Sequence, residues 1–306
     1  MSAALYCVAD ASYFLGAVGL VNSLRLVGHA EPIVLLDCGL TGEQRALLER
    51  EVEIVPSPTD AAPHVLKAIA PRQRPAEAMA LIDADMIVTR HLGALLDEAR
   101  EGRVIAGGAE MERFCPEWGE LLDLGDVRPV AYVSTGFVVC GGRLGRQLVE
   151  LVDERRDAVD FELTFWRRNV PSYPLLHADQ DLINAVLAAR AADREIRVFD
   201  PRLSASPPFA GLAIVDEATL ACAYDDGAEP YVIHHWLTKP WLEPTEDGIY
   251  SRLLRRLLDA DDVPVRVPER LVPLRLRRGL RGYAARKRID AGKRIGRRAR
   301  RALARG

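Results

Sequence analysis

The sequence lacks several features that would assign it to a specialised class of protein. No apolar run approaches the roughly 18 residues of a transmembrane helix. The N-terminal stretch MSAALYCVAD has no basic segment before its apolar residues, so we expect a first β-strand there and not a signal peptide. The five cysteines are odd in number and show no CxxC spacing, which disfavours a zinc site; several lie in apolar runs, as buried thiols in a reducing cytosol would. We find no internal repeat.

Charge is unevenly distributed along the chain. From Arg270 to Gly306 there are 15 arginines and lysines against one acid, Asp290, yet the whole chain has a net charge of −3. The first 269 residues must therefore be strongly acidic. We expect one domain over residues 1–268 and a basic tail over 269–306 that is flexible or associates with membranes.

The first 110 residues alternate short apolar runs with helix-like stretches. Strands are expected at 4–10, 31–37, 51–55, 78–83 and 103–108, and helices at 13–28, 41–50 and 91–102. Thr41 followed by Gln44 is a capping-box pattern. With 306 residues and 49% apolar content, the chain can bury a sizeable core. This alternation predicts an α/β fold with a mainly parallel sheet flanked by helices, whose ligands bind beyond the carboxyl ends of the strands.

Two aspartates follow an apolar run in ALIDADMIVTR, residues 80–90. In an extended strand, Asp83 and Asp85 would point to the same side and repel each other unless a positive group lay between them. That group could be a hard divalent cation or an arginine, and water could also lie between the two carboxylates. Because such a pair also occurs by chance, the motif alone leaves a solvated turn as an alternative.

Polar residues also follow a late strand in YVIHHWLTKPW, residues 231–241. His234 or His235 could complete a manganese-type site, and Lys239 could hold a phosphate as a point charge. A surface histidine pair and an ordinary lysine are the alternative.

The motif HADQDLINAVL begins a predicted helix. Asp179 fits a helix cap, but capping does not explain Gln180 and Asp181 beside it. Polar groups at a helix start are also well placed to face a polyhydroxyl ligand. In VADASY, Asp10 and Tyr13 end the first strand and could contact a nucleobase, although such residues are often only turn and core.

The order of these motifs resembles glycosyltransferase family 8, the group of glycogenin and the bacterial lipopolysaccharide galactosyltransferases. The series VADASY, DAD, STGF, DQDLIN and H…KPW runs from about Leu5 to Trp241. The resemblance implies a Rossmann-like GT-A fold, a nucleotide-sugar donor that is usually UDP-linked, Mn²⁺ (with Mg²⁺ as a substitute), and transfer with retention at the anomeric carbon.

The resemblance also implies roles for single residues. The residues matching nucleotide-binding positions are Ala9, Asp10, Tyr13, Asp83, Ala84 and Lys239; those matching sugar-binding positions are Ser134, Thr135, Gly136, Asp179 and Gln180; the metal would take Asp83, Asp85 and His234 or His235. Asp179 and Gln180 would be the catalytic pair. Because an amide is a poor nucleophile, Gln180 would position the donor and stabilise charge.

The chain departs from the family pattern at two points. The family usually has a glycine after the histidine and six residues from histidine to lysine, whereas His234 precedes Lys239 by five and His235 by four. Ser134 stands where an asparagine often touches the sugar, so the donor sugar cannot be carried over. The altered histidine loop keeps open a degenerate, non-catalytic member that binds a nucleotide sugar or a partner. A nucleotidyltransferase or an inverting transferase on the same fold also stays open.

The tail mixes basic residues with Leu276, Leu280, Tyr283, Ile295 and Leu303, and its four glycines weaken a helix. Such a segment is typical of adsorption to anionic lipid headgroups, and a solubilising tail is the alternative. Nucleic acid is not expected because the body is acidic. The sequence therefore predicts a cytoplasmic glycosyltransferase at the inner membrane face, with a saccharide or glycolipid acceptor and a role in polysaccharide biosynthesis.

Overall fold

The structure is a computed structural model that describes residues 2–109, 111–245 and 247–303. Its centre is a seven-stranded sheet in the order β3-β2-β1-β4-β7-β6-β8. The strands are β1 (Ala3–Ala9), β2 (Ile33–Asp37), β3 (Glu53–Pro56), β4 (Ala78–Ile82), β6 (Val104–Gly108), β7 (Val133–Gly141) and β8 (Ile196–Phe199). Only β7 runs antiparallel to its neighbours β4 and β6 among the pairs of this sheet. The predicted mainly parallel sheet is confirmed.

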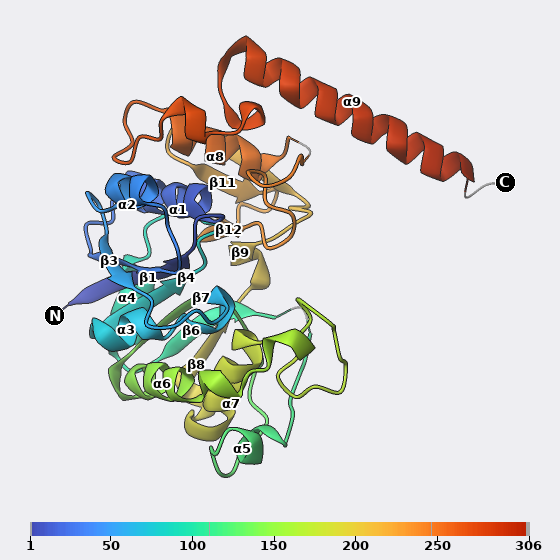
Figure 1. Cartoon of the computed structure of the whole chain (residues 1–306). Helices are drawn as coiled ribbons and strands as arrows, with labels where there is room; N and C mark the ends of the chain where they lie inside the picture. The colour runs from blue at the N-terminus through green and yellow to red at the C-terminus, as the bar shows by residue number, and fades with distance from the viewer. Residues whose placement is uncertain (1, 110, 246, 304–306) are drawn as a thin grey trace.

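Helices cover both faces of this sheet because its strands are apolar on both sides. Along β1, Leu5 and Cys7 pack into one core and Ala4 and Tyr6 into the other. The first core contains α1 (Phe14–Leu26), α2 (Gly42–Leu48), α4 (Gly93–Arg100) and α8 (Ile249–Asp259). The second contains α3 (Ile69–Gln73), α5 (Trp118–Leu121), α6 (Gly142–Arg155) and α7 (Asp179–Arg190). Figure 1 shows α1, α2 and α8 above the sheet and α3, α5, α6 and α7 below it.

Smaller elements complete the domain around the carboxyl end of β4. A second sheet has the order β5-β12-β9, formed by β5 (Met86–Val88), β12 (Val232–His234) and β9 (Ser204–Ala205). The strands β10 (Leu212–Asp216) and β11 (Ala221–Tyr224) form a hairpin. Short 3-10 turns are η1 (Pro63–Val65), η2 (Arg156–Ala158), η3 (Phe161–Leu163), η4 (Asp193–Glu195), η5 (Pro201–Leu203), η6 (Glu269–Leu271) and η7 (Leu274–Leu276). The late strand predicted at 231–236 therefore belongs to this second sheet and not to the main one.

Local signals in the first half agree with the structure. Thr41 Oγ1 accepts from the Gln44 N–H at 3.2 Å and Gln44 Oε1 accepts from the Thr41 N–H at 2.9 Å, which is the predicted capping box. Three cysteines are buried, and all five are free thiols: Cys7, Cys38, Cys115, Cys140 and Cys222. The segments 112–130 and 200–213 contain α5, β9 and the start of β10.

The basic tail forms one long helix, α9 (Gly279–Leu303), which extends away from the body (Figure 1). The four glycines do not interrupt it. The segment before it belongs to the core, because Val272 and Leu276 are buried there. In the part of the chain that the structure describes, no helix combines the length and the apolar character that crossing a bilayer requires.

Candidate functional site

The predicted motifs meet beyond the carboxyl ends of β1 and β4. Asp10 follows β1, Asp83 follows β4, and β7 passes alongside with Thr135 and Gly136. His234 ends β12, which pairs antiparallel with β5. This is the edge of a parallel sheet at which ligands bind in α/β folds.

The two aspartates of the DxD motif lie in a tight turn between β4 and β5, not on one extended strand. The Asp83 N–H donates to the Gly136 carbonyl at 2.8 Å, and the Met86 N–H donates to the Asp83 carbonyl at 3.0 Å. The prediction that Asp83 and Asp85 share one face of an extended strand is therefore wrong. The two carboxylates still converge, because the turn directs both of them toward His234.

Asp83, Asp85 and His234 form a cluster whose ligand atoms all lie within 4.8 Å of one another. His234 Nε2 is 3.1 Å from Asp85 Oδ1 and 3.9 Å from Asp83 Oδ2. Asp85 Oδ1 is buried and accepts no hydrogen bond. Because His234 Nε2 lies 3.1 Å from this oxygen, either a proton on that nitrogen or a cation held between the two groups would compensate the buried charge. Two carboxylates and an imidazole suit Mn²⁺, so these residues fit the metal that the resemblance implies.

The space for this cluster depends on Gly136. A Cβ at this position would lie 2.6 Å from Met86 Cε, 2.9 Å from His234 Cε1 and 3.1 Å from Asp83 Oδ2. Any larger residue would push against two of the three ligands. The glycine of the STGF motif is therefore explained by close approach.

The structure brings His234, and not His235, to the aspartates. The His235 ring packs against Tyr250 and Phe209, with centroids 5.1 and 6.1 Å away. Burial lowers the pKa of His235. The geometry favours His234 as the third ligand.

Lys239 holds the outer oxygen of Asp85. Its ammonium pairs with Asp85 Oδ2 and donates to the His235 carbonyl at 2.7 Å. Burial alone would raise the pKa of Asp85, but the charges of His234 and Lys239 outweigh it and hold that pKa well below its usual range. Asp85 is thus kept ionised, as a metal ligand must be.

A second lysine, Lys67, was missed by the sequence motifs. Its Nζ lies 2.7 Å from Asp83 Oδ1 and 2.7 Å from Asp179 Oδ2, and it donates to the Thr135 carbonyl at 3.1 Å. Burial would lower the pKa of Lys67, but Asp179 and Asp83 raise it above its usual value. The only signal in the sequence is a lone cation in the apolar run PHVLKAIAP. Lys67 links the DxD turn to the start of α7.

Asp179 begins α7 but does not cap it. The N-cap is Ala178, which makes no side-chain cap bond and has φ 51°. The Asp179 carboxylate instead pairs with Lys67 and accepts from Thr135 Oγ1 at 3.1 Å. A non-glycine residue at positive φ stores strain that often marks a functional position. Of the two interpretations left open by the sequence, the structure supports the one in which Asp179 faces the site.

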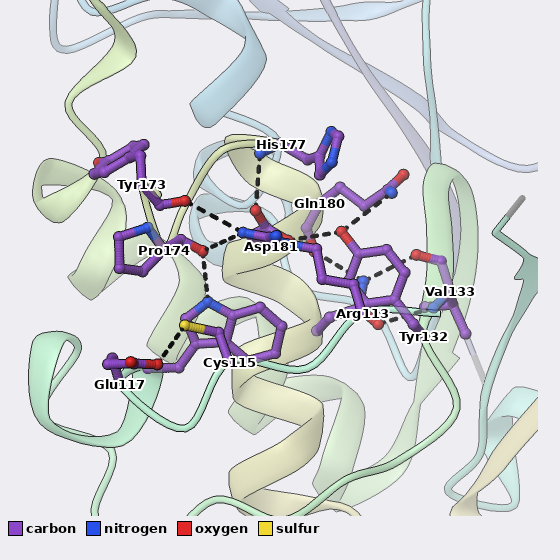
Figure 2. Close-up of polar contacts among 12 residues, drawn as sticks. Arg113, Cys115, Glu117, Tyr132, Val133, Tyr173, Pro174, His177, Gln180 and Asp181 are labelled. Atoms are coloured by element: carbon purple, nitrogen blue, oxygen red, sulfur yellow. Dashed lines mark hydrogen bonds and ion pairs between the residues drawn. The ribbon is translucent and has the colours of Figure 1, made fainter. Parts of the chain in front are cut away.

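Asp181 anchors the start of α7, as Figure 2 shows. It is fully buried and accepts from Arg113 Nε at 2.8 Å, the Tyr132 hydroxyl at 2.7 Å and the His177 N–H at 2.8 Å. Gln180 Nε2 donates to the same Tyr132 hydroxyl at 3.2 Å. This network fixes where Gln180 points and explains the acid that capping could not.

The residues expected to bind the nucleotide lie on the side of the DxD turn opposite the start of α7. The Asp10 carboxylate accepts from the Ser12 and Tyr13 N–H groups at 2.8 and 3.0 Å, which shapes the turn into α1. Ala9 is buried in β1, and Ala84 is buried against α1: a Cβ at Gly16 would lie 2.5 Å from the Ala84 carbonyl oxygen. Tyr13 remains partly exposed beside Lys239, whose Nζ is 5.7 Å from the ring centroid. Ser134 is also partly exposed.

A second cluster, His29, Glu31 and His91, has similar ligand atoms. His29 Nε2 accepts from the Leu92 N–H at 2.9 Å, so the proton of the neutral ring sits on Nδ1, which faces Glu31 at 2.8 Å. A cation at Nδ1 would force a proton onto Nε2, against the Leu92 N–H. This cluster is closed by its own hydrogen bonds.

Solved structures share this arrangement of elements. A galactosyltransferase LgtC in complex with donor and acceptor sugar analogs is 14% identical with a TM-score of 0.51, over 85% of this chain and 98% of that one. The apo-form glycosyltransferase GlyE of Streptococcus pneumoniae TIGR4 is 14% identical with a TM-score of 0.53, over 85% of this chain and 61% of that one. The bifunctional glycosyltransferase WbbM is 14% identical with a TM-score of 0.52, over 86% of this chain and 50% of that one, so this chain spans about half its length.

No family model and no curated protein matches this sequence. The structural likeness shows the fold, and the predicted GT-A glycosyltransferase fold is confirmed.

Proposed function

We propose that the chain is a Mn²⁺-dependent retaining glycosyltransferase that takes its sugar from a UDP-linked donor. The observation that carries this proposal is the buried Asp85 Oδ1, which lacks a hydrogen bond beside His234 and Asp83. Asp83, Asp85 and His234 would hold the ion. Bound there, a divalent cation neutralises the charge that develops on a departing diphosphate.

One group of residues would bind the nucleoside diphosphate of the donor, and a second group would bind its sugar. Lys239, beside Asp85, is placed to exchange part of its ion pair for a phosphate oxygen. Asp10 and Tyr13 lie on the same side and would meet the nucleoside. Asp179 and Gln180 begin α7 on the opposite side, where the sugar would lie.

A retaining transfer would have to use the residues of the second side. Asp179 is already paired with Lys67 and bonded to Thr135, and Gln180 is an amide held by Tyr132. Neither is a strong nucleophile in this state. They would hold the sugar while the acceptor attacks from the face that the diphosphate leaves.

Hydrolysis of a panel of UDP-sugars, with Mn²⁺ and with EDTA, tests the proposal. Wild type should release UDP only with the metal, and Asp85→Ala should release it at least about 100-fold more slowly, the scale of losing one electrostatic stabiliser. A thermal-shift screen of nucleotide sugars with Mn²⁺ would identify the donor. If UDP does not bind and EDTA changes nothing, the proposal fails; if UDP-sugar binds tightly but never turns over, the chain is a binding protein instead.

We further propose that α9 adsorbs to the anionic inner face of a membrane, close to a saccharide or lipid-linked acceptor. Leu280 and Tyr283 on α9 are 86% and 54% exposed, and Lys287, Arg288 and Lys293 follow on the same helix. Each basic residue near such a surface contributes about 1 kcal/mol. Replacing those three by glutamine should weaken binding to vesicles that contain phosphatidylglycerol but leave the chain folded. Equal binding of both proteins to those vesicles would contradict the proposal.

A further inference from the structure

Large aromatic side chains are exposed on the segment between α6 and α7. Phe165 is 45% exposed and Trp166 is 43% exposed. Their rings pack edge to face, with centroids 5.4 Å apart. In Figure 1 this segment is the yellow-green chain that projects beside α7. Exposed apolar side chains that gather in this way mark interaction sites more often than isolated ones do.

The aromatic rings connect directly to the residues around the proposed sugar site. The Trp166 ring packs on the His64 ring with centroids 5.5 Å apart, and the Phe165 ring packs on the His177 ring with centroids 6.0 Å apart. His64 lies three residues before Lys67, and His177 lies two before Asp179. His64 lies near enough to Asp179 and Lys67 for their charges to act on its pKa, so the ring under Trp166 borders this ion pair.

The segment is held in shape. The Phe165 N–H donates to the Leu176 carbonyl at 2.8 Å, and the Val170 N–H donates to the Leu163 carbonyl at 3.1 Å. Thr164 is buried and its hydroxyl donates to the Phe161 carbonyl at 2.7 Å. Burial lowers the pKa of His64, so the ring beneath Trp166 is neutral at pH 7. The two exposed rings, whose planes lie at 82° to each other, thus form a fixed apolar corner and not a loose loop.

We propose that Phe165 and Trp166 bind the acceptor, as a platform on which a pyranose ring of a saccharide stacks. This rests on the proposed transferase function. A pyranose presents a face of C–H groups that matches the flat, electron-rich face of an aromatic ring, while its hydroxyls stay hydrated. The Trp166 ring packs on His64, which borders Lys67 and Asp179, so a sugar stacked there would lie next to the donor side.

The surrounding charges favour a saccharide over a lipid surface. Arg167 Nε pairs with Glu162 Oε1 at 3.7 Å, and Asp160 and Glu162 together balance Arg167 and Arg168, so the segment is not a basic patch like α9. Attraction to anionic headgroups requires an excess of Lys and Arg. The face of one exposed aromatic ring, with balanced charge around it, suits a neutral sugar.

Saturation-transfer NMR on the full chain, without donor or metal, tests the platform. The probes are methyl β-galactopyranoside, methyl β-glucopyranoside and methyl α-mannopyranoside, with sorbitol as a polyol that has no ring. At least one glycoside should show transfer to its ring C–H protons, and Trp166→Ala should raise its Kd about tenfold, as the loss of one stacked ring predicts. Val215→Ala, on β10 and 69% exposed in wild type, is the matched control and should leave the signal unchanged.

Two results would overturn the proposal. One is that no glycoside binds, or that Trp166→Ala binds as wild type does. The other is that sedimentation shows a wild-type dimer that Trp166→Ala converts to monomer, because the face would then be an interface between copies. Failure of the transferase function would show differently, as absent UDP-sugar hydrolysis by wild type in a protein that still binds the glycoside.

Discussion

The Asp83–Asp85–His234 and His29–Glu31–His91 clusters contain similar ligand atoms at similar spacing, but they differ in how those atoms are already bonded. In the first, Asp85 Oδ1 accepts no hydrogen bond and two lysines hold the outer carboxylate oxygens. In the second, both ring nitrogens of His29 are engaged. The difference shows that spacing alone does not make a metal site: a cation needs an acceptor that the fold has left free.

Removing the positive charge of Lys67, which pairs with Asp83 of the first cluster, should have the largest effect. Lys67→Met leaves Asp83 and Asp179 facing each other without a counter-charge, so we expect kcat/KM for UDP-sugar hydrolysis to fall by about 100-fold or more. Lys67→Arg keeps the charge and should recover part of the activity. Activity of Lys67→Met within a factor of about two of wild type would show that the cluster does not need this bridge.

Filling the space among the ligands should have the next largest effect. Gly136→Ala places a methyl group against His234 and Asp83, so Mn²⁺ affinity should fall by about 10-fold to 100-fold, the range seen when ligand orientation is disturbed. Calorimetric titration with Mn²⁺ measures this. Gly42→Ala is the control, because a Cβ there meets nothing within 4 Å; equal loss in both variants would point to general destabilisation.

The second cluster should respond in stability and not in metal affinity. His29→Ala removes a buried ring and the acceptor for the Leu92 N–H, so the free energy of unfolding should fall by about 2–4 kcal/mol. Urea denaturation measures the loss. Reduced Mn²⁺ affinity in the folded variant would break the distinction between the two clusters.

The smallest expected effect is on the pH dependence of stability. Burial lowers the pKa of His29 below the ordinary histidine value of 6.5. The unfolded chain therefore binds more protons than the folded chain just below that pH, and stability is lost as pH falls through this window. His29→Gln should flatten the slope of unfolding free energy between about pH 7.5 and 5.5 by less than one proton, and an unchanged slope would mean that His29 does not titrate there.

The alternation of apolar runs predicted the sheet because it depends on local periodicity, and the GT-A fold was predicted by the resemblance of the ordered motifs to a known family. Lys67 could not be found in this way: its partners Asp83 and Asp179 come from other elements, and their meeting depends on how the segment before α3 and the start of α7 pack on the sheet. The convergence of Asp83 and Asp85 was expected for the wrong reason, since the turn that directs them is set by β5 pairing with β12. The roles of Asp181 and Ala178 likewise need the three-dimensional contacts of α7.

Mn²⁺ binding by the wild type, Asp85→Ala and Glu31→Ala, followed by electron paramagnetic resonance of the free ion, tests the central claim most directly. The account predicts one site in wild type, at least about tenfold weaker binding in Asp85→Ala, and unchanged binding in Glu31→Ala. Binding that survives in Asp85→Ala and is lost in Glu31→Ala would contradict it.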